Sequence, residues 1–124
     1  MMKATLAALM MVLSASVASA ADDWNALAID DDTMTVGMAV DQPSKEAAEA
    51  LAKSECLKEG AKGCGTVVSR EGGCLALSRN ASGSSLGYGM EDTIQETVAE
   101  ALKQCADGGK YEGCTVHSNM CASN

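Results

Sequence analysis

The hydrophobic and polar positions of this chain form one pattern that occurs twice, about fifty residues apart. Each copy has two short apolar runs around a polar turn, then a helix-like stretch, a cysteine loop and a short β-branched run. The strand, turn and strand are Asn25 to Ile29, Asp30 to Asp32 and Thr35 to Ala39 in the first copy, and Leu75 to Ser78, Asn80 to Ser84 and Leu86 to Met90 in the second. The pattern predicts an α+β fold of two pseudo-symmetric strand-strand-helix-strand repeats, about 24–73 and 74–121, forming a small antiparallel sheet with two helices.

Capping signals and apolar spacing predict where the two helices lie. The first is expected to start near Ser44, after Pro43, and to end at Gly60. The second follows a capping box, Thr93 to Glu96, and ends at Gly108-Gly109. The apolar stripes are Ala48, Leu51, Ala52 and Cys56 on the first helix, and Ile94, Val98, Ala101, Leu102 and Cys105 on the second. We align the helices by Cys56 and Cys105 rather than by their shared Ala-Glu-Ala-Leu, because a cross-link fixes geometry and Ala-rich helices repeat by chance.

The first twenty residues have the features of a cleavable signal peptide. Lys3 is followed by an apolar run from Thr5 to Leu13 that is too short to span a bilayer, and Ala18-Ser19-Ala20 has the small residues of a cleavage site. We therefore predict a signal peptide at 1–20 and a single disulfide-rich domain at 21–124, located in the periplasm or secreted. Loss of Lys3 brings the formal net charge of −8 to about −9.

Six cysteines lie in the exported part, and the chain has no Phe and one Trp. An even cysteine count in an oxidising compartment predicts a disulfide framework, and a core of Ala, Val, Leu and Met needs such support. Pseudo-symmetry predicts that Cys56 pairs with Cys64 and Cys105 with Cys114, each tying a helix end to the following strand. The remaining bond, Cys74–Cys121, is expected to join the two halves, so that removing it destabilises the protein most and loosens them. Mapping of unreduced peptides checks this pairing.

These residues also resemble a known family. Trp24 to Ala28 after a signal peptide, strands containing Gly37 and Gly87, two Ala-rich helices ending in Cys, and strands at Val67-Val68 and Thr115-Val116 are similar to domain-of-unknown-function family 4189. The similarity covers Trp24 to Cys121, and the doubled pattern carries it. It implies an exported bacterial domain of this fold and transfers no catalytic residue. One departure is Gly72-Gly73 directly before Cys74, where a bulkier residue is expected; it leaves the length of that strand open.

No residue pattern indicates catalysis, a cofactor or a metal site, so we predict a non-enzymatic protein. His117 is the only histidine, lies between Cys114 and Cys121, and is interpreted as a neutral surface residue. Asp30-x-Asp32 begins like a calcium loop but lacks the following ligand and glycine, so a solvated hairpin turn is expected. A soft copper site is the alternative for the mature methionines with His117, and core filling is preferred. The methionines are Met34, Met38, Met90 and Met120.

Charge restricts the partners. A pI near 4.4 and eight basic residues after residue 20 argue against nucleic acid and against an anionic membrane surface after signal cleavage. We therefore expect a monomeric binding or interaction protein whose partner is a cationic protein, for example a wall hydrolase. A secreted effector that acts on a host or competitor, and an unrecognised hydrolase, are the alternatives.

Processing is the first testable expectation. Mature protein from the exporting cell should begin at Ala21, give or take about two residues, and contain no free thiol, because all six cysteines are expected in disulfides. Intact mass before and after alkylation without reduction measures both. A species that retains Met1, or that takes up the alkylating agent, contradicts the compartment assignment.

Overall fold

The computed structural model describes residues 22–123, and the predicted signal peptide at 1–20 lies outside them. The order strand-strand-helix-strand occurs twice along the described chain, which confirms the predicted repeats. The elements are β1 Trp24–Asp30, β2 Thr35–Gln42, α1 Lys45–Lys58 and β3 Thr66–Glu71 in the first half, and β4 Cys74–Arg79, β5 Leu86–Glu91, α2 Ile94–Ala106 and β6 Thr115–Cys121 in the second. No helix of the described residues has the length and apolarity needed to cross a membrane.

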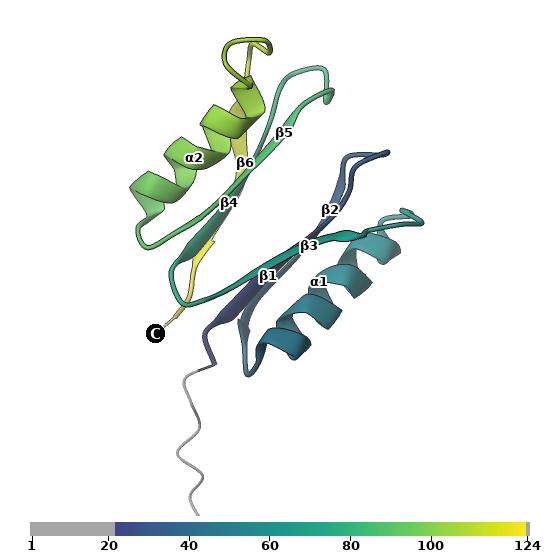
Figure 1. Ribbon diagram of the computed structural model, residues 1–124, viewed down its shortest axis with the longest axis vertical. Coiled ribbons are helices and arrows are strands. Elements are labelled where there is room, and N and C mark those ends of the chain that lie inside the picture. The colour runs from purple at the N-terminus through teal and green to yellow at the C-terminus, as the bar shows by residue number, and fades with distance from the viewer. Residues whose placement is uncertain (1–21, 124) are drawn as a thin grey trace, which may run out of the picture.

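Each half builds its own antiparallel sheet of three strands, with the orders β2-β1-β3 and β5-β4-β6. The strands therefore form two sheets, whereas the repeat pattern predicted one. The reason is that β1 and β4 already have a strand on both sides within their own halves. The two sheets lie between the helices, with α1 on one outer side and α2 on the other (Figure 1).

Both helices begin at the residues that the capping signals predict. The Ser44 hydroxyl accepts the Ala47 amide at 3.1 Å, and the Thr93 hydroxyl accepts the Glu96 amide at 3.2 Å. α1 ends before Gly60, whose φ is +93°. α2 ends at Ala106, and its C-cap Asp107 adopts the left-handed conformation with φ 46° immediately before the two glycines.

The helices lie unusually close to their sheets. A Cβ on Gly37 would overlap the backbone of Ala52 and Cys56 in α1, and a Cβ on Gly87 would overlap the backbone of Ala101 and Cys105 in α2. Only glycine permits this approach. The two glycines contact equivalent helix turns, which confirms that aligning Cys56 with Cys105 is the correct register.

The buried stripe of α2 differs from the prediction, because only two of its five predicted residues are buried and Thr97 joins them. Thr97, Ala101 and Cys105 are buried, whereas Ile94, Val98 and Leu102 are only half-buried. A Cβ on Gly89 would overlap the Thr97 carbonyl, so the helix is too close to the sheet there for a large side chain. The Thr97 hydroxyl donates to the Thr93 carbonyl at 2.7 Å and accepts the Glu91 amide at 3.1 Å, and these bonds offset its burial.

A second apolar layer lies between the two sheets. Along β1 and β4 successive side chains point to opposite faces, so Leu27 and Leu75 point away from the helices. Both are fully buried, and Ile29 and Leu77 on the same faces are nearly so. This layer holds the larger aliphatic side chains, while the helix-facing layer of the first half is mainly alanine and cysteine.

The disulfides are Cys56–Cys64, Cys105–Cys114 and Cys74–Cys121, the three pairs that pseudo-symmetry predicts. The first two tie the C-terminal end of a helix to the loop before the next strand. Cys74–Cys121 does not join the halves, contrary to expectation, because Cys74 begins β4 and pairs directly with Cys121 at the end of β6. All three bonds lie within one half or the other. Removing Cys74–Cys121 therefore opens an edge strand of the second sheet.

The halves are connected by a two-residue turn, Gly72-Gly73. Both glycines have positive φ, 71° and 70°, and a Cβ on Gly73 would meet the Glu91 carbonyl oxygen at 2.5 Å. A bulkier residue is therefore excluded at Gly73. The turn ends β3 at Glu71 and starts β4 at Cys74, which settles the strand length that the sequence left open.

The close helix approach yields a stability prediction. Gly37→Ala should lower the free energy of unfolding by at least about 3 kcal/mol, because its Cβ would displace the backbone of α1. The matched control is Gly65→Ala, where a Cβ meets nothing within 4 Å and the change should stay within about 1 kcal/mol. Urea unfolding measures both. Equal effects of the two substitutions would contradict this packing.

Candidate functional site

The topology gathers many element ends at one end of the molecule. β1, β4, α1 and α2 begin there, and β2, β3, β5 and β6 end there (Figure 1). We call this the junction end, because the Gly72-Gly73 turn between the halves lies in it. Charged residues near the starts of β1, β4, α1 and α2, and near the ends of the other strands, therefore lie at the junction end.

Negative charge concentrates at the junction end. Nine acidic and two basic side chains lie there, whereas the rest of the described chain carries eight acidic and six basic ones. The two bases are Lys45 and Arg70. The nine acids are Asp22, Asp23, Asp41, Glu46, Glu49, Glu71, Glu91, Asp92 and Glu96. The net negative charge that the sequence shows is therefore located mainly at one end.

Both bases of the junction end lie beside acids. Arg70 donates to the Met90 carbonyl at 3.0 Å and forms an ion pair with Asp92, which connects β3 of the first half to the end of β5 in the second. Lys45 lies 4.0 Å from Glu49, one turn along α1. Positive charge here is thus already engaged with neighbouring carboxylates.

Part of this uneven distribution of acidic and basic side chains stabilises the helices. Glu46 lies in the first turn of α1 and Glu96 in the first turn of α2, while Lys58 and Lys103 lie in the last turns. Acids at helix N-termini and bases at C-termini interact favourably with the helix dipole. Because both helices start at the junction end, this local preference also polarises the whole molecule.

Asp41 links the first half to the C-terminal residues. It lies in a bulge of β2 with φ 55°, and its amide donates to the buried Asn25 side chain at 3.3 Å. Its carboxylate accepts the Ser123 amide at 2.8 Å and the Ser123 hydroxyl at 2.6 Å. These two bonds hold the pKa of the Asp41 carboxyl below its ordinary value.

Asn25 ties the same region together from inside. Its side chain is fully buried, and its amide group donates to the Gly72 carbonyl at 3.2 Å. It therefore contacts the turn between the halves and the β2 bulge at once. Sequence reasoning did not identify Asn25, Asp41, Arg70 or Ser123 as a connected group, and no local signal marks them, since their contacts span up to 82 residues.

The Asp30 to Asp32 segment forms the β1–β2 hairpin turn at the opposite end, as predicted. Asp30 itself is buried rather than solvated, which corrects that part of the expectation. Its carboxylate accepts the amides of Gly63 at 3.1 Å, Asp32 at 3.0 Å and Thr33 at 3.3 Å. The bond from Gly63 is the main cause that holds the pKa of the Asp30 carboxyl low. Asp30 thus ties the hairpin to the loop of Cys64.

The structure separates the residues that a copper site would need. His117 lies exposed in β6, at the irregularity opposite Leu77 and Ser78, while Met34 lies in the β1–β2 turn. Met38 pairs with Leu27, and Met90 and Met120 flank Leu75 from its two neighbouring strands. Met38 and Met90 are half-buried and contribute to the layer between the sheets, whereas Met120 is 38% exposed.

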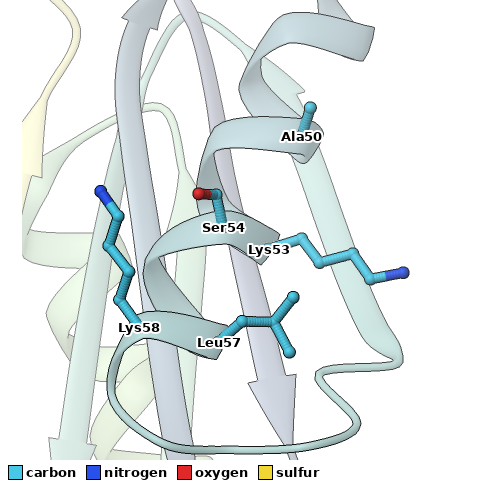
Figure 2. A pocket seen from close by; sticks show the side chains of 5 residues that line it. All are labelled: Ala50, Lys53, Ser54, Leu57 and Lys58. Carbon is cyan, nitrogen blue, oxygen red and sulfur yellow. The ribbon is translucent and has the colours of Figure 1, made fainter.

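The outer side of α1 carries an open hollow (Figure 2). In this view Lys53 and Lys58 extend to opposite sides, with Leu57 between them, and Ala50 and Ser54 complete the lining. Leu57 is 42% exposed, and Lys58 donates to Glu55 at 3.1 Å. All five side chains come from one helix and no polar groups converge, so the hollow has the character of a helix surface.

Comparison with known proteins finds a family and a fold. The family model described as "Domain of unknown function (DUF4189)" matches residues 24–121. The chain is also similar to the NMR structure of Rv1813c from Mycobacterium tuberculosis, with 21% identity and a TM-score of 0.59. That match covers 98% of this chain and 94% of the other, and at this identity it shows the fold alone. No curated protein matches the chain.

The two carboxyls with lowered pKa generate an acid-stability prediction. Each favours the folded state above its ordinary pKa of 3.8, and this contribution is lost as the pH falls through the lower folded-state pKa. The free energy of unfolding should therefore decrease between about pH 5 and pH 2, and Asp41→Asn or Asp30→Asn should each reduce that decrease. Urea unfolding across this range measures it. Asp32→Asn, which removes an exposed carboxylate from the same turn as Asp30, is the matched change of charge with which the two variants are compared.

Proposed function

Since the chain belongs to the family described as "Domain of unknown function (DUF4189)", as its residues predicted, its role must be inferred from its own surface, and we propose a binding function. The protein is an exported, non-enzymatic domain that engages a cationic protein, such as a wall hydrolase, through the junction end. The observation that carries this proposal is the location of the charge, nine acids against two bases at one end.

Export is the first step of the proposal. Three disulfides fit an exported protein, because such bonds form and persist in oxidising compartments. The signal peptide predicted at 1–20 supplies the route. We accordingly place the mature domain in the periplasm or outside the cell, acting as a monomer.

Electrostatic steering is the second step. An excess of seven acids at one end gives the molecule a direction in which a cationic partner is attracted. At physiological ionic strength this attraction is screened beyond about 8 Å, so it acts mainly on partners that already approach the surface. Its principal effect is on the association rate and on orientation rather than on affinity alone.

The breadth of the acidic surface favours a protein over a small cation. Its carboxylates come from the N-terminal segment, the ends of β2, β3 and β5, and the first turns of both helices. Carboxylates spread over so many elements do not converge on one small cation. They match a partner that presents several cationic side chains at once. Hen lysozyme is therefore a suitable probe, and lysozyme with acetylated amines is its neutralised counterpart.

Charge reversal at the junction end tests the proposal. Asp22→Lys with Glu71→Lys, both at exposed positions, should lower the association rate with lysozyme by about tenfold at low ionic strength. Stopped-flow fluorescence or surface plasmon resonance measures the rate, and the wild-type rate should fall as salt is added. Acetylated lysozyme should associate slowly with both proteins.

The matched control places the same charge change at the other end. Glu59→Lys with Glu112→Lys reverses two exposed acids there and alters the net charge equally. This variant should retain most of the wild-type rate. If both double variants lose the rate equally, net charge alone attracts the probe and the junction end is not the binding surface.

A further inference from the structure

The six cysteines differ in their exposure. Cys56, Cys64 and Cys105 are fully buried and Cys114 is half-buried, so each helix-end bond has at least one partner inside the core. Cys121 is the exposed cysteine of the set, and it lies at the end of the edge strand β6. Its partner Cys74 is buried at 4% exposure. Among the three disulfides, Cys74–Cys121 is therefore the most open to a reagent from solution.

The residues after Cys121 contact the turn between the halves and the first half. The Ala122 amide donates to the Gly73 carbonyl at 2.8 Å, and Ser123 donates twice to Asp41. Among the described strands β6 pairs with β4 alone, up to Cys121, so its last residues are held by this pairing, by the cross-link and by these surface hydrogen bonds. The bond that a solution reagent can reach therefore lies two residues before the contact between Ser123 and the first half.

We infer that Cys74–Cys121 is a redox-sensitive latch, opened by a dithiol reductant before the other two disulfides, and that its opening releases Ala122 and Ser123 from the junction end. This inference is independent of the proposed binding function. It rests on the exposure of Cys121 and on the hydrogen bonds that follow it. Exposed disulfides are those that reductants reach and that act as labile or regulatory bonds.

The chemistry is an ordinary exchange between thiol and disulfide. A thiolate of the reductant attacks Sγ of Cys121, a mixed disulfide forms there, and Cys74 leaves as a thiolate that takes a proton from water. The second thiol of the reductant then attacks its own sulfur in the mixed disulfide, and Cys121 leaves as a thiolate. The protein gains two electrons, and the reductant becomes a cyclic disulfide.

Limited reduction tests the order of opening. The oxidised full mature protein is treated with increasing dithiothreitol, trapped with iodoacetamide and mapped by peptide mass spectrometry. We expect a species with label on Cys74 and Cys121 alone to accumulate first. Label on Cys105 and Cys114, or on Cys56 and Cys64, before or together with this pair would overturn the inference.

Hydrogen exchange tests the release. In the species opened at Cys74–Cys121, the amides of Ala122 and Ser123 should exchange faster, while those of α1 and α2 keep their wild-type rates. Asp41→Asn is the matched control. It weakens the hydrogen bonds from Ser123 without changing a cysteine, so the three disulfides should still be reduced in the wild-type order. Unchanged exchange at Ala122 and Ser123 after opening would overturn the latch. Because the wild-type protein is opened after it has folded, the test does not depend on whether a cysteine variant folds.

Discussion

The close approach of each helix to its sheet is the constraint on which the rest of the structure depends. Gly37 under α1 and Gly87 under α2 allow backbone to meet backbone, so the space between helix and sheet admits only small side chains. Alanines and cysteines fill it in the first half, and Thr97, Ala101 and Cys105 are the buried side chains of α2 in the second. Such side chains bury little apolar area, at about 0.8 kcal/mol per methylene-sized group. The helix-end disulfides, at roughly 2.5 kcal/mol each in the chain-entropy model, therefore contribute a large share of the stability.

The second consequence concerns the two halves. Each half closes its own sheet and carries its own helix-end disulfide, and all three bonds of the described chain stay within a half. The apolar layer around Leu27 and Leu75 packs sheet against sheet, while polar contacts of Arg70 and Asp41 hold the halves at the junction end. The relation between the halves thus depends on packing and hydrogen bonds. Acid weakens one of these contacts directly, because the Asp41 carboxylate that accepts from Ser123 becomes protonated at low pH.

The proposed binding surface and the stability of the fold share residues. The helices begin at the same end because each follows a strand that ends there, and acids near helix N-termini are favourable locally. The acidic end is therefore partly a product of topology, and a partner that neutralises it would also act on the residues that hold the halves together. A fold of this kind does not state a function by itself, and the location of the charge is the property that favours a cationic protein.

The sequence alone determined the elements, the doubled order, the helix caps and the three cysteine pairs, because these depend on local spacing and on a repeat that compares the chain with itself. Tertiary structure decided that the repeats form two sheets, that Cys74–Cys121 lies inside one half, and that Thr97 is buried. It also brought Asn25, Asp41 and Ser123 together. These features depend on contacts between segments far apart in the chain. They also depend on the short distance between helix backbone and sheet backbone, which no single residue in the sequence indicates. Charge was visible in the composition, but its concentration at one end follows only from where the strands and helices begin.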